Sequence, residues 1–363
     1  MATTSAGNAT ITANGGTVSG ANGGNIIFHS NSSTSATAGY ATITVNGGSA
    51  GGALGATLQF FIDTTAANAT IITNGGTNGG AGGITEFLEP SVGGTARAIT
   101  NAGGSFDISD QSGGGIGIGS IEGAGNYYLG ANTLTTGGNG LSTTVSGVIA
   151  DGGIGGGTGG SLVKVGAGTL TLAGANTYTG TTTISGGTLL VNGSLAGGAV
   201  SVGPGAILGG NGTLGGSVST SAGGIIIPGN LTVSSFSWSG DTGGNATAFF
   251  DLGGAGNTSS RLLISGVFSN GAPGDTFLFN FGDGGDTAGN VTYTLVTFAS
   301  SSGFTTGNFS YTDLNPDLTG AFDLTGDELQ FTVTAVPEPA MLGILFAGAS
   351  LLVVIRRRKT PSA

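Results

Sequence analysis

Residues 159–193 read GGSLVKVGAGTLTLAGANTYTGTTTISGGTLLVNG and contain the pattern on which the fold depends. Short apolar runs are separated by Gly, Ala, Thr and Asn, and Thr169-Leu170-Thr171-Leu172 alternates polar and apolar residues. This alternation is expected of a β-strand with one buried face, because successive side chains point to opposite sides. Threonine suits the outward positions of a strand, and glycine suits tight turns. The stretch therefore predicts short strands joined by turns.

The same pattern returns at a nearly constant spacing. Gly168-Thr169-Leu170 is followed after 19 residues by Gly187-Thr188-Leu189, and after a further 18 by Gly205-Ala206-Ile207. Strand-length units that recur at a fixed period indicate a solenoid, in which each unit forms one coil and stacks on its neighbours. We therefore expect an all-β chain folded as a parallel β-helix, or β-solenoid.

A second repeat occupies residues 1–105. Its copies begin at Ala9-Thr10-Ile11, Ala41-Thr42-Ile43 and Ala69-Thr70-Ile71, at offsets of 32 and 28 residues, and each copy continues into Asn-Gly-Gly. A more divergent fourth copy covers residues 98–104. Because Asn-Gly readily adopts the positive φ angles of tight turns, each copy is predicted to form one coil with an Asn-Gly corner.

Phe28, Phe60 and Phe87 mark another position that recurs in these copies. Inward stacking of the three rings, one per coil, is the simpler interpretation, because a solenoid buries a continuous apolar core. A platform of exposed rings that stacks on sugars is the alternative. The two interpretations differ in the face of the strand from which the rings project.

The composition favours an ordered β protein and excludes some functions. Glycine accounts for 79 of 363 residues, charged residues for 7 % and hydrophobic residues for 38 %. Disordered chains usually combine low hydrophobicity with high charge, so this balance argues against disorder. The formal net charge of -11 lacks the basic footprint that nucleic-acid binding requires. Cysteine is absent, which removes disulfides, thiolate metal sites and cysteine nucleophiles.

Changes of pattern divide the chain into five predicted segments. Aromatic and acidic residues concentrate after residue 231, where a C-terminal β cap would cover the open last coil. Pro204 and Pro228 are predicted to lie in turns, because a central strand would exclude them. The segments are N-terminal repeats at 1–105, looser β coils at 106–160, the repeat region at 161–230, the cap at 231–335 and a tail at 336–359.

The middle of the chain contains a recognisable family pattern. It consists of Lys164-Val-Gly-Ala-Gly-Thr-Leu-Thr-Leu-Ala-Gly-Ala-Asn-Thr-Tyr-Thr-Gly, followed by Thr183-Ile184 and Gly187-Thr188-Leu189. This run closely resembles the autotransporter-associated β-strand repeat, also called the passenger-associated transport repeat. The resemblance implies a β-helical segment in a large exported bacterial surface protein, and it implies no enzymatic activity.

The tail has three parts in a fixed order. Val336-Pro337-Glu338-Pro339 precedes residues 340–355, which are 16 residues without a charge, and Arg356-Arg357-Arg358-Lys359 follows at once. At ~1.5 Å per residue a helix of this length spans ~24 Å, somewhat less than the ~30 Å hydrocarbon core of a bilayer. The run predicts a single short C-terminal transmembrane helix, and the basic cluster predicts that this end stays in the cytoplasm.

This order of motif, apolar segment and basic cluster resembles the PEP-CTERM sorting signal. The resemblance implies transient anchoring in the inner membrane and processing of the tail by exosortase, a membrane cysteine transpeptidase. Val336, Pro337, Glu338 and Pro339 would form the sorting motif, and Arg356, Arg357, Arg358 and Lys359 the membrane stop. An ordinary tail anchor is the alternative. Met1-Ala-Thr-Thr-Ser-Ala-Gly contains no visible secretory signal, so we expect a truncated start.

The sequence contains no recognisable catalytic constellation. His29 is the sole histidine, and its place after Ile26-Ile27-Phe28 predicts an exposed strand end. A nucleophilic triad needs a base beside its nucleophile, which argues against that chemistry here. The acidic pairs Glu86/Glu89 and Asp107/Asp110 could serve a β-helical glycan-active enzyme, but neither pair lies in a known motif.

Two glycine-rich stretches resemble cation sites. Gly209-Gly210-Asn211-Gly212-Thr213-Leu214 approaches the repeat of calcium β-rolls, but Thr213 stands near the place of the carboxylate that a hard cation requires. Asp283-Gly284-Gly285-Asp286 is a better candidate, although a solvated turn is the simpler interpretation. We therefore expect no metal and no cofactor.

Taken together, these patterns indicate a non-enzymatic exported bacterial protein of the cell surface or extracellular matrix. Its predicted partners are exosortase and, through the C-terminal helix, the inner membrane. An adhesin or polysaccharide-binding surface module is the first alternative, because exposed Thr and Asn rows and the aromatic region could contact extracellular polysaccharide. A β-helical polysaccharide-active enzyme is the second.

Overall fold

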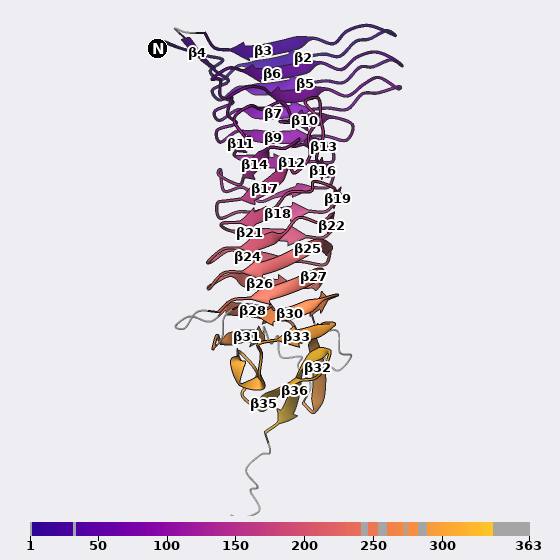
Figure 1. Cartoon of the computed structure of the whole chain (residues 1–363). Coiled ribbons are helices and arrows are strands. Elements are labelled where there is room, and N and C mark those ends of the chain that lie inside the picture. The colour runs from indigo at the N-terminus through magenta and orange to yellow at the C-terminus, as the bar shows by residue number, and fades with distance from the viewer. Residues whose placement is uncertain are drawn as a thin grey trace, which may run out of the picture.

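The computed structural model describes residues 2–31, 34–240, 246–252, 260–271, 274–281 and 289–336. In these residues the chain is an all-β column in which short strands coil around a common axis and each coil stacks on the previous one (Figure 1). The one helical element of the described part is a 3-10 turn at Thr306–Asn308. Among the described residues, no helix has the length and apolar character that a membrane crossing requires. The predicted transmembrane helix lies beyond residue 336, outside those residues.

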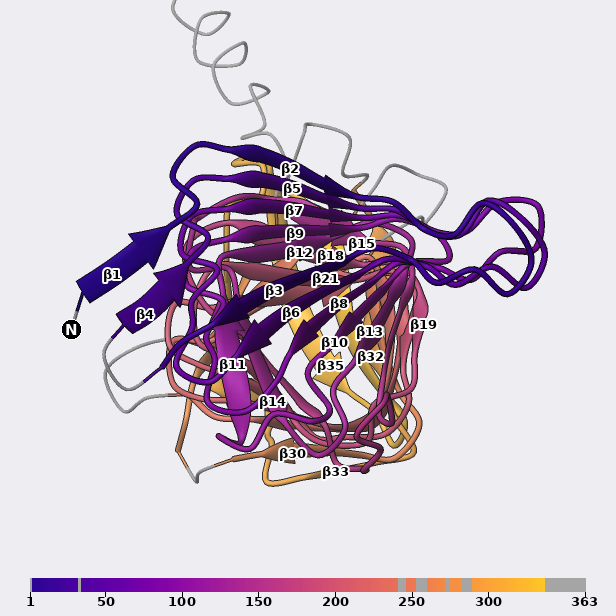
Figure 2. The ribbon, with the colours of Figure 1, turned by 90° about the horizontal axis from the view of Figure 1, so that it is seen from above.

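The column has three faces, and on each face the strands of successive coils pair in parallel (Figure 2). On the first face, a bridge between Gly123 and Val145 joins two sheets end to end. The strands of this face are β2 (Thr10–Ala13), β5 (Thr42–Val45), β7 (Thr70–Thr73), β9 (Arg97–Thr100), β12 (Ser120–Glu122), β15 (Thr143–Val145), β18 (Thr169–Leu172), β21 (Thr188–Val191), β24 (Ile207–Gly210), β26 (Ile225–Pro228), β28 (Ala246–Phe250), β31 (Phe277–Phe281) and β34 (Phe309–Thr312).

The other two faces share two long strands, β25 and β27, which turn the corner between them. The second face contains β3 (Asn25–His29), β6 (Thr57–Phe61), β8 (Ile84–Phe87), β10 (Ser105–Asp107), β13 (Asn126–Tyr128), β16 (Val148–Ala150), β19 (Ala175–Asn176), β22 (Ser194–Leu195), the first parts of β25 (Thr213–Thr220) and β27 (Asn230–Trp238), β29 (Arg261–Ile264) and β32 (Val291–Thr297). The third contains β11 (Gly115–Ile118), β14 (Thr133–Thr136), β17 (Ser161–Lys164), β20 (Thr182–Ile184), β23 (Val200–Val202), the last parts of β25 and β27, β30 (Val267–Asn270) and β33 (Ser300–Ser302). Beside the first coils lies a separate pair, β1 (Ala2–Ser5) and β4 (Thr34–Thr37).

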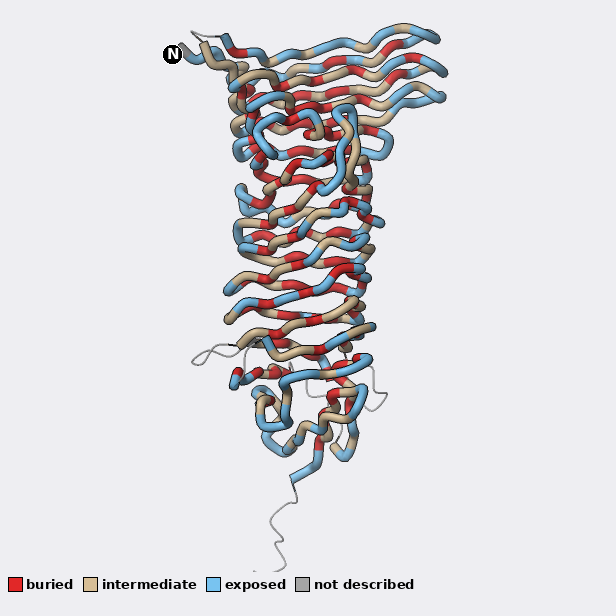
Figure 3. The backbone as a smooth tube through the Cα atoms, in the orientation of Figure 1, coloured by how far each residue is buried: buried red, intermediate tan, exposed pale blue. Residues whose placement is uncertain are grey.

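Inward and outward residues alternate along the strands, as the sequence pattern predicts (Figure 3). Leu170, Leu189 and Leu208 occupy the same position in successive coils and are at most 2 % exposed. Ile226 continues this row in the next coil. The core is thus a set of apolar ladders that run the length of the column.

Phenylalanine and asparagine ladders hold the first coils in register. The rings of Phe28 and Phe60 are stacked with centroids 5.0 Å apart, and those of Phe60 and Phe87 with centroids 4.7 Å apart. Phe60 and Phe87 are fully buried, which confirms core stacking over a sugar platform. At the predicted corner, the Asn46 side-chain amide donates to Asn14 Oδ1 at 2.8 Å, and Asn74 donates to Asn46 in the same way.

Three long loops project side by side from the first coils, at residues 14–24, 46–56 and 74–83, and we call this projection the fin (Figure 2). Backbone hydrogen bonds join successive loops, for example from Ser49 N to Gly16 O at 2.8 Å. The loops approach so closely that a Cβ at position 15 would lie 2.3 Å from the carbonyl carbon of Gly47. Glycine is therefore required here because no side chain fits between the stacked backbones.

The column ends in an antiparallel β cap. β36 (Glu328–Ala335) pairs antiparallel with β32 on one side and with β35 (Leu318–Leu324) on the other. The aromatic rings of the C-terminal region fill the space beneath it, and the Phe281 and Phe331 centroids are 4.4 Å apart. Parallel stacking itself continues past residue 231 as far as β34, so the antiparallel part is confined to the last strands.

The two prolines behave differently. Pro204 lies in a turn, as predicted, but Pro228 is the last residue of β26 and pairs with Gly210, so its predicted turn is wrong. The strand tolerates this proline because Gly229 donates the next hydrogen bond, to Gly210 O at 2.9 Å.

Lys164 occupies an inward position at the end of β17, beside the buried Ile184 of the next coil. Its ammonium group donates to the carbonyl oxygens of Val165 at 2.7 Å, Gly166 at 3.0 Å and Gly186 at 3.1 Å. Burial lowers the pKa of the Lys164 ammonium below its ordinary value. The side chain thus ties together the corner turns of two successive coils.

Replacing Lys164 by Met should lower the free energy of unfolding by about 1–3 kcal/mol, because three partly buried hydrogen bonds from a charged donor are lost. Since the pKa of Lys164 is lowered in the folded state, its contribution to stability rises with pH between the lowered pKa and the ordinary value of 10.5. The Met variant should lack this slope. Urea unfolding as a function of pH measures both effects. Thr171→Met, on the outer surface of β18, is the control, and equal stability of the two variants would contradict the assignment.

Candidate functional site

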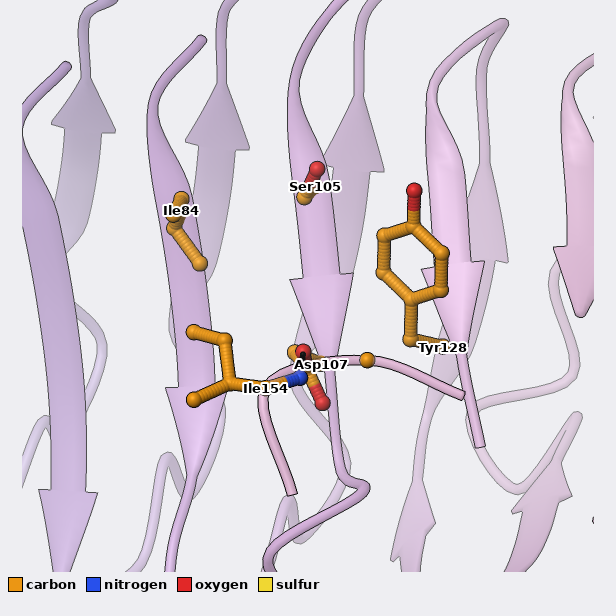
Figure 4. A pocket seen from close by; sticks show the side chains of 6 residues that line it. Ile84, Ser105, Asp107, Tyr128 and Ile154 are labelled. Carbon is orange, nitrogen blue, oxygen red and sulfur yellow. Dashed lines mark hydrogen bonds between the residues drawn. The ribbon is translucent and has the colours of Figure 1, made fainter. Parts of the chain in front are cut away.

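A groove lies on the outer surface of β8, β10 and β13, on the second face of the column. In these strands Phe106 and Tyr127 point into the core, so the residues that follow them, Asp107 and Tyr128, point outward. Ile84 and Ile154 lie on one side of the groove and Tyr128 on the other, with Ser105 and Asp107 between them (Figure 4). The groove has a volume of about 340 Å³ and is lined by Ile84, Ser105, Asp107, Tyr128, Gly153 and Ile154.

One wall of the groove is the glycine-rich loop at residues 151–160, which Asp107 holds in place. Asp107 Oδ2 accepts the backbone N–H of Ile154 at 2.9 Å, and Oδ1 accepts that of Ser109 at 2.7 Å. The Ser109 hydroxyl in turn accepts the N–H of Gly155 at 2.8 Å. Asp107 therefore binds the loop directly through Oδ2, and its Oδ1 holds Ser109, whose hydroxyl binds the loop a second time.

Asp151 anchors the ends of the same loop. Its Oδ1 accepts the N–H of Gly160 at 2.9 Å, and its Oδ2 accepts the hydroxyl of Thr179 at 2.7 Å. Burial by itself would raise the pKa of Asp151, but the hydrogen bonds from Thr179 and from the backbone of Gly159 and Gly160 outweigh burial and hold this pKa below its ordinary value. The loop is thus held by hydrogen bonds to two carboxylates, those of Asp107 and Asp151.

Glu86 is the second buried carboxylate of this surface, and it pairs in register with Asp107. The Gln59 side chain on β6 donates to Glu86 Oε2 at 2.7 Å. Burial raises the pKa of Glu86, the hydrogen bond from Gln59 partly offsets this, and the charges of Asp107 and Asp110 raise it further. Ionisation of Glu86 is consequently less favourable in the folded protein than in the unfolded chain.

The groove offers an aromatic ring, two apolar side chains and a hydroxyl, which is the composition of a site for a ligand with both apolar and polar surface. The Tyr128 ring is half-buried, whereas Ile154 at the rim is 63 % exposed. Within the part of the chain that the structure describes, no cluster of three His, Cys, Asp or Glu side chains could hold a metal ion.

The structure regroups the acidic pairs of the sequence. Glu86 lies on the strand next to Asp107 and interacts electrostatically with both Asp107 and Asp110, whereas Glu89 is exposed beyond the end of β8. His29 is exposed at the end of β3, as predicted, and its ring stacks on Phe61 at a centroid distance of 5.7 Å. The sequence patterns did not single out Tyr128 as a groove residue. Its outward position beside Asp107 follows from the pairing of β10 with β13, and the alternation in Asn126–Tyr128 could have indicated it.

Of the two stretches that resemble cation sites, the structure describes the one at 209–214. In 209–214, Asn211 forms a corner ladder: its N–H donates to Asn192 Oδ1 at 3.2 Å, and its Oδ1 accepts the N–H of Asn230 at 2.9 Å. Asp283 and Asp286 lie outside the described residues. Of the predicted sorting motif, Val336 is described, and it is exposed directly after β36. Pro337, Glu338, Pro339 and the basic cluster at 356–359 also lie outside the described residues.

Comparison with known proteins gives one family match. Residues 162–191 match the family model of the passenger-associated-transport-repeat. This match supports the predicted repeat. The matched residues include β18, β19, β20, β21 and nearly all of β17, which is more than one full coil of the column. No curated protein matches the chain.

Glu86→Gln should raise the stability of the protein at neutral pH. Because the pKa of Glu86 is raised in the folded state, its favourable contribution is present below the ordinary value of 4.5 and is lost as pH increases through the folded-state pKa. Glutamine does not ionise, so the variant keeps this stability as pH increases. Its side-chain oxygen can still accept the hydrogen bond from Gln59. Thermal unfolding should therefore show a higher Tm for the variant at pH 7 and a smaller difference at pH 4.

Glu89→Gln is the matched control, since Glu89 is exposed three residues further along the chain. Its Tm should follow that of the unmodified protein at both pH values. A lower Tm of Glu86→Gln at pH 7 would show that the ionised carboxylate stabilises the fold, which contradicts this reading of the groove.

Proposed function

We propose that this chain is the displayed part of an exported bacterial surface or extracellular-matrix protein, and that it acts without enzymatic chemistry. The uninterrupted β column, which contains a matched passenger-associated transport repeat, is the observation that supports this most. A parallel column gains about 4.8 Å of length with each coil, so it suits a protein that must extend away from a membrane.

The end of the column supports a role for the tail as a sorting signal. Val336 follows β36 at the cap end and is 43 % exposed, with its N–H bonded to Asp317 O at 2.8 Å. The motif therefore begins where the folded column stops, and the prolines after it disfavour continuation of the strand. A membrane enzyme such as exosortase would meet the motif at this end, and the fin would lie at the far end of the column (Figure 1).

Replacing Pro337, Glu338 and Pro339 together by Ala should abolish processing in a bacterial host with active exosortase. The expected result is a full-length protein that stays in the inner-membrane fraction, because the transpeptidase no longer recognises the tail. Mass spectrometry of the C-terminus and membrane fractionation measure this.

The matched control is Pro204→Ala, which alters a turn within the column and leaves the tail intact. It should be processed like the unmodified protein. A mature unmodified protein that still contains Arg356–Lys359 in that host would contradict the processing claim.

Polysaccharide binding in the groove is the second candidate function. Tyr128 and the two isoleucines provide surfaces for the apolar faces of sugar rings, and Ser105 provides a hydroxyl between them. A glycan-active enzyme receives less support, because Asp107 would have to give up the hydrogen bonds that hold the loop before it could act as acid or base.

Tyr128→Ala should lower the affinity for matrix polysaccharide about ten-fold or more, as expected when an aromatic anchor contributing about 1–3 kcal/mol is lost. Glycan arrays and calorimetry with the full chain measure this. Tyr40→Ala is the control, since Tyr40 is 67 % exposed in a turn remote from the groove residues in sequence. Equal binding by both variants, or no binding by the unmodified protein, would exclude the groove as a polysaccharide site.

A further inference from the structure

The acidic residues in the first two thirds of the chain belong to the coils that form the groove. Residues 1–240 contain seven acidic side chains, and all of them fall between positions 63 and 151. They are Asp63, Glu86, Glu89, Asp107, Asp110, Glu122 and Asp151. Residues 1–62 and 165–240 contain no Asp, Glu, Lys or Arg. The coils around the groove are therefore the acidic part of a stretch that is otherwise nearly uncharged.

No basic side chain compensates the carboxylates of the groove. Between positions 63 and 151 the sequence contains one basic residue, Arg97, and its guanidinium pairs with Glu122 on the first face. Lys164 follows on the third face, where its ammonium group points inward and donates to carbonyl oxygens. Within the described residues, Glu86 and Asp107 therefore have no ion pair.

These two carboxylates lie side by side on the second face. Asp107 lines the groove, between the side formed by the two isoleucines and the side formed by Tyr128 (Figure 4). Glu86 pairs in register with Asp107 and is 5 % exposed. Its Oε2 accepts from Gln59, whereas its Oε1 accepts no hydrogen bond from the described residues. A positively charged ligand group in the groove would offset this concentration of negative charge.

The groove also has polar groups that are available to a ligand. The hydroxyl groups of Ser105 and Tyr128 form no hydrogen bond with other described residues. Asp107 accepts backbone N–H groups, but each carboxylate oxygen has more than one lone pair and can accept a further donor. The face of the Tyr128 ring can attract a cation and can pack against the apolar face of a sugar.

We propose that the groove binds a polysaccharide whose sugars have protonated amino groups, with a sugar ring against Tyr128 and an amino group beside Asp107. This inference deepens the second candidate function and rests on it, because it takes the groove as a polysaccharide site. Tyr128 favours a sugar over a lysine-rich peptide, since a sugar ring presents a rigid apolar face and projects its polar groups from the edge. The negative charge of the groove disfavours acidic polysaccharides.

Calorimetry of the full chain in detergent with three tetrasaccharides tests the charge of the ligand. Tetraglucosamine, whose amino groups are partly protonated at pH 7, should bind about ten-fold more tightly than tetra-N-acetylglucosamine, because hydrogen bonds to charged groups are the stronger ones. The acidic tetragalacturonate should bind more weakly than either. If the first two oligomers bind with equal affinity and Tyr128→Ala abolishes both, the polysaccharide site stands and the inference about charge is overturned. No binding by any oligomer overturns both.

A pair of variants tests whether the groove itself recognises the charge. Glu86→Gln should lower the affinity for tetraglucosamine about five-fold and leave that for tetra-N-acetylglucosamine unchanged, because one charge beside the groove is lost. Asp323→Asn, which removes the same charge from an exposed position of β35 in the cap, is the control and should change neither affinity.

Two outcomes of this experiment would overturn the proposal. Equal losses of affinity in Glu86→Gln and Asp323→Asn would show that the net charge of the chain, rather than the groove, attracts the ligand. Tetralysine that displaces tetraglucosamine with the same affinity would show that ammonium groups alone account for binding, without any contribution from the sugar.

Discussion

Most strands of the column are hydrogen-bonded to the strand one coil earlier and to the strand one coil later, and this pairing places residues of one type directly above one another. Leu stacks on Leu in the core and Phe stacks on Phe in the first coils. Asn side chains form ladders at the corner that follows the first face, in the first coils and again from Asn192 to Asn230. Where backbones of the fin meet, only glycine fits. The repetitive composition of the chain follows from this register.

The same constraint explains the scarcity of charge and its few exceptions. A charged residue at a repeated position would face its own copy in every coil, and directly opposed like charges destabilise a sheet. Glu86 and Asp107 pair in register on adjacent strands, and there burial, together with the charge of Asp107, raises the pKa of Glu86. This carboxylate pair lies at the coils where the fin ends and where the third face begins with β11. The loop at 151–160 folds back over the same strands. The groove is thus a product of the change in coil geometry.

The repeated features of the fold could be predicted from the sequence, and the features that occur once could not. The alternation of polar and apolar residues and the spacing of the repeats were enough to predict the strands at Leu170 and Leu189. They also predicted the inward-facing rings of Phe28 and Phe60. An inward Lys164 contradicts the polarity pattern, and its partners are carbonyl groups that no sequence motif marks. The groove could not be predicted either, because Asp107 meets Ile154 through a loop contact across 47 positions.

The central claim is that the chain forms one column of parallel coils in register, and pulsed electron spin resonance tests it most directly. Thr135, Ser219, Ser237 and Ser269 lie in one outward row of the third face, with Ser219, Ser237 and Ser269 four, five and six coils from Thr135. With one spin label at position 135 and the other at 219, 237 or 269, the distance should increase by about 5 Å per coil, to about 19, 24 and 29 Å. Broad distributions, or distances that do not increase in this order, would contradict the column.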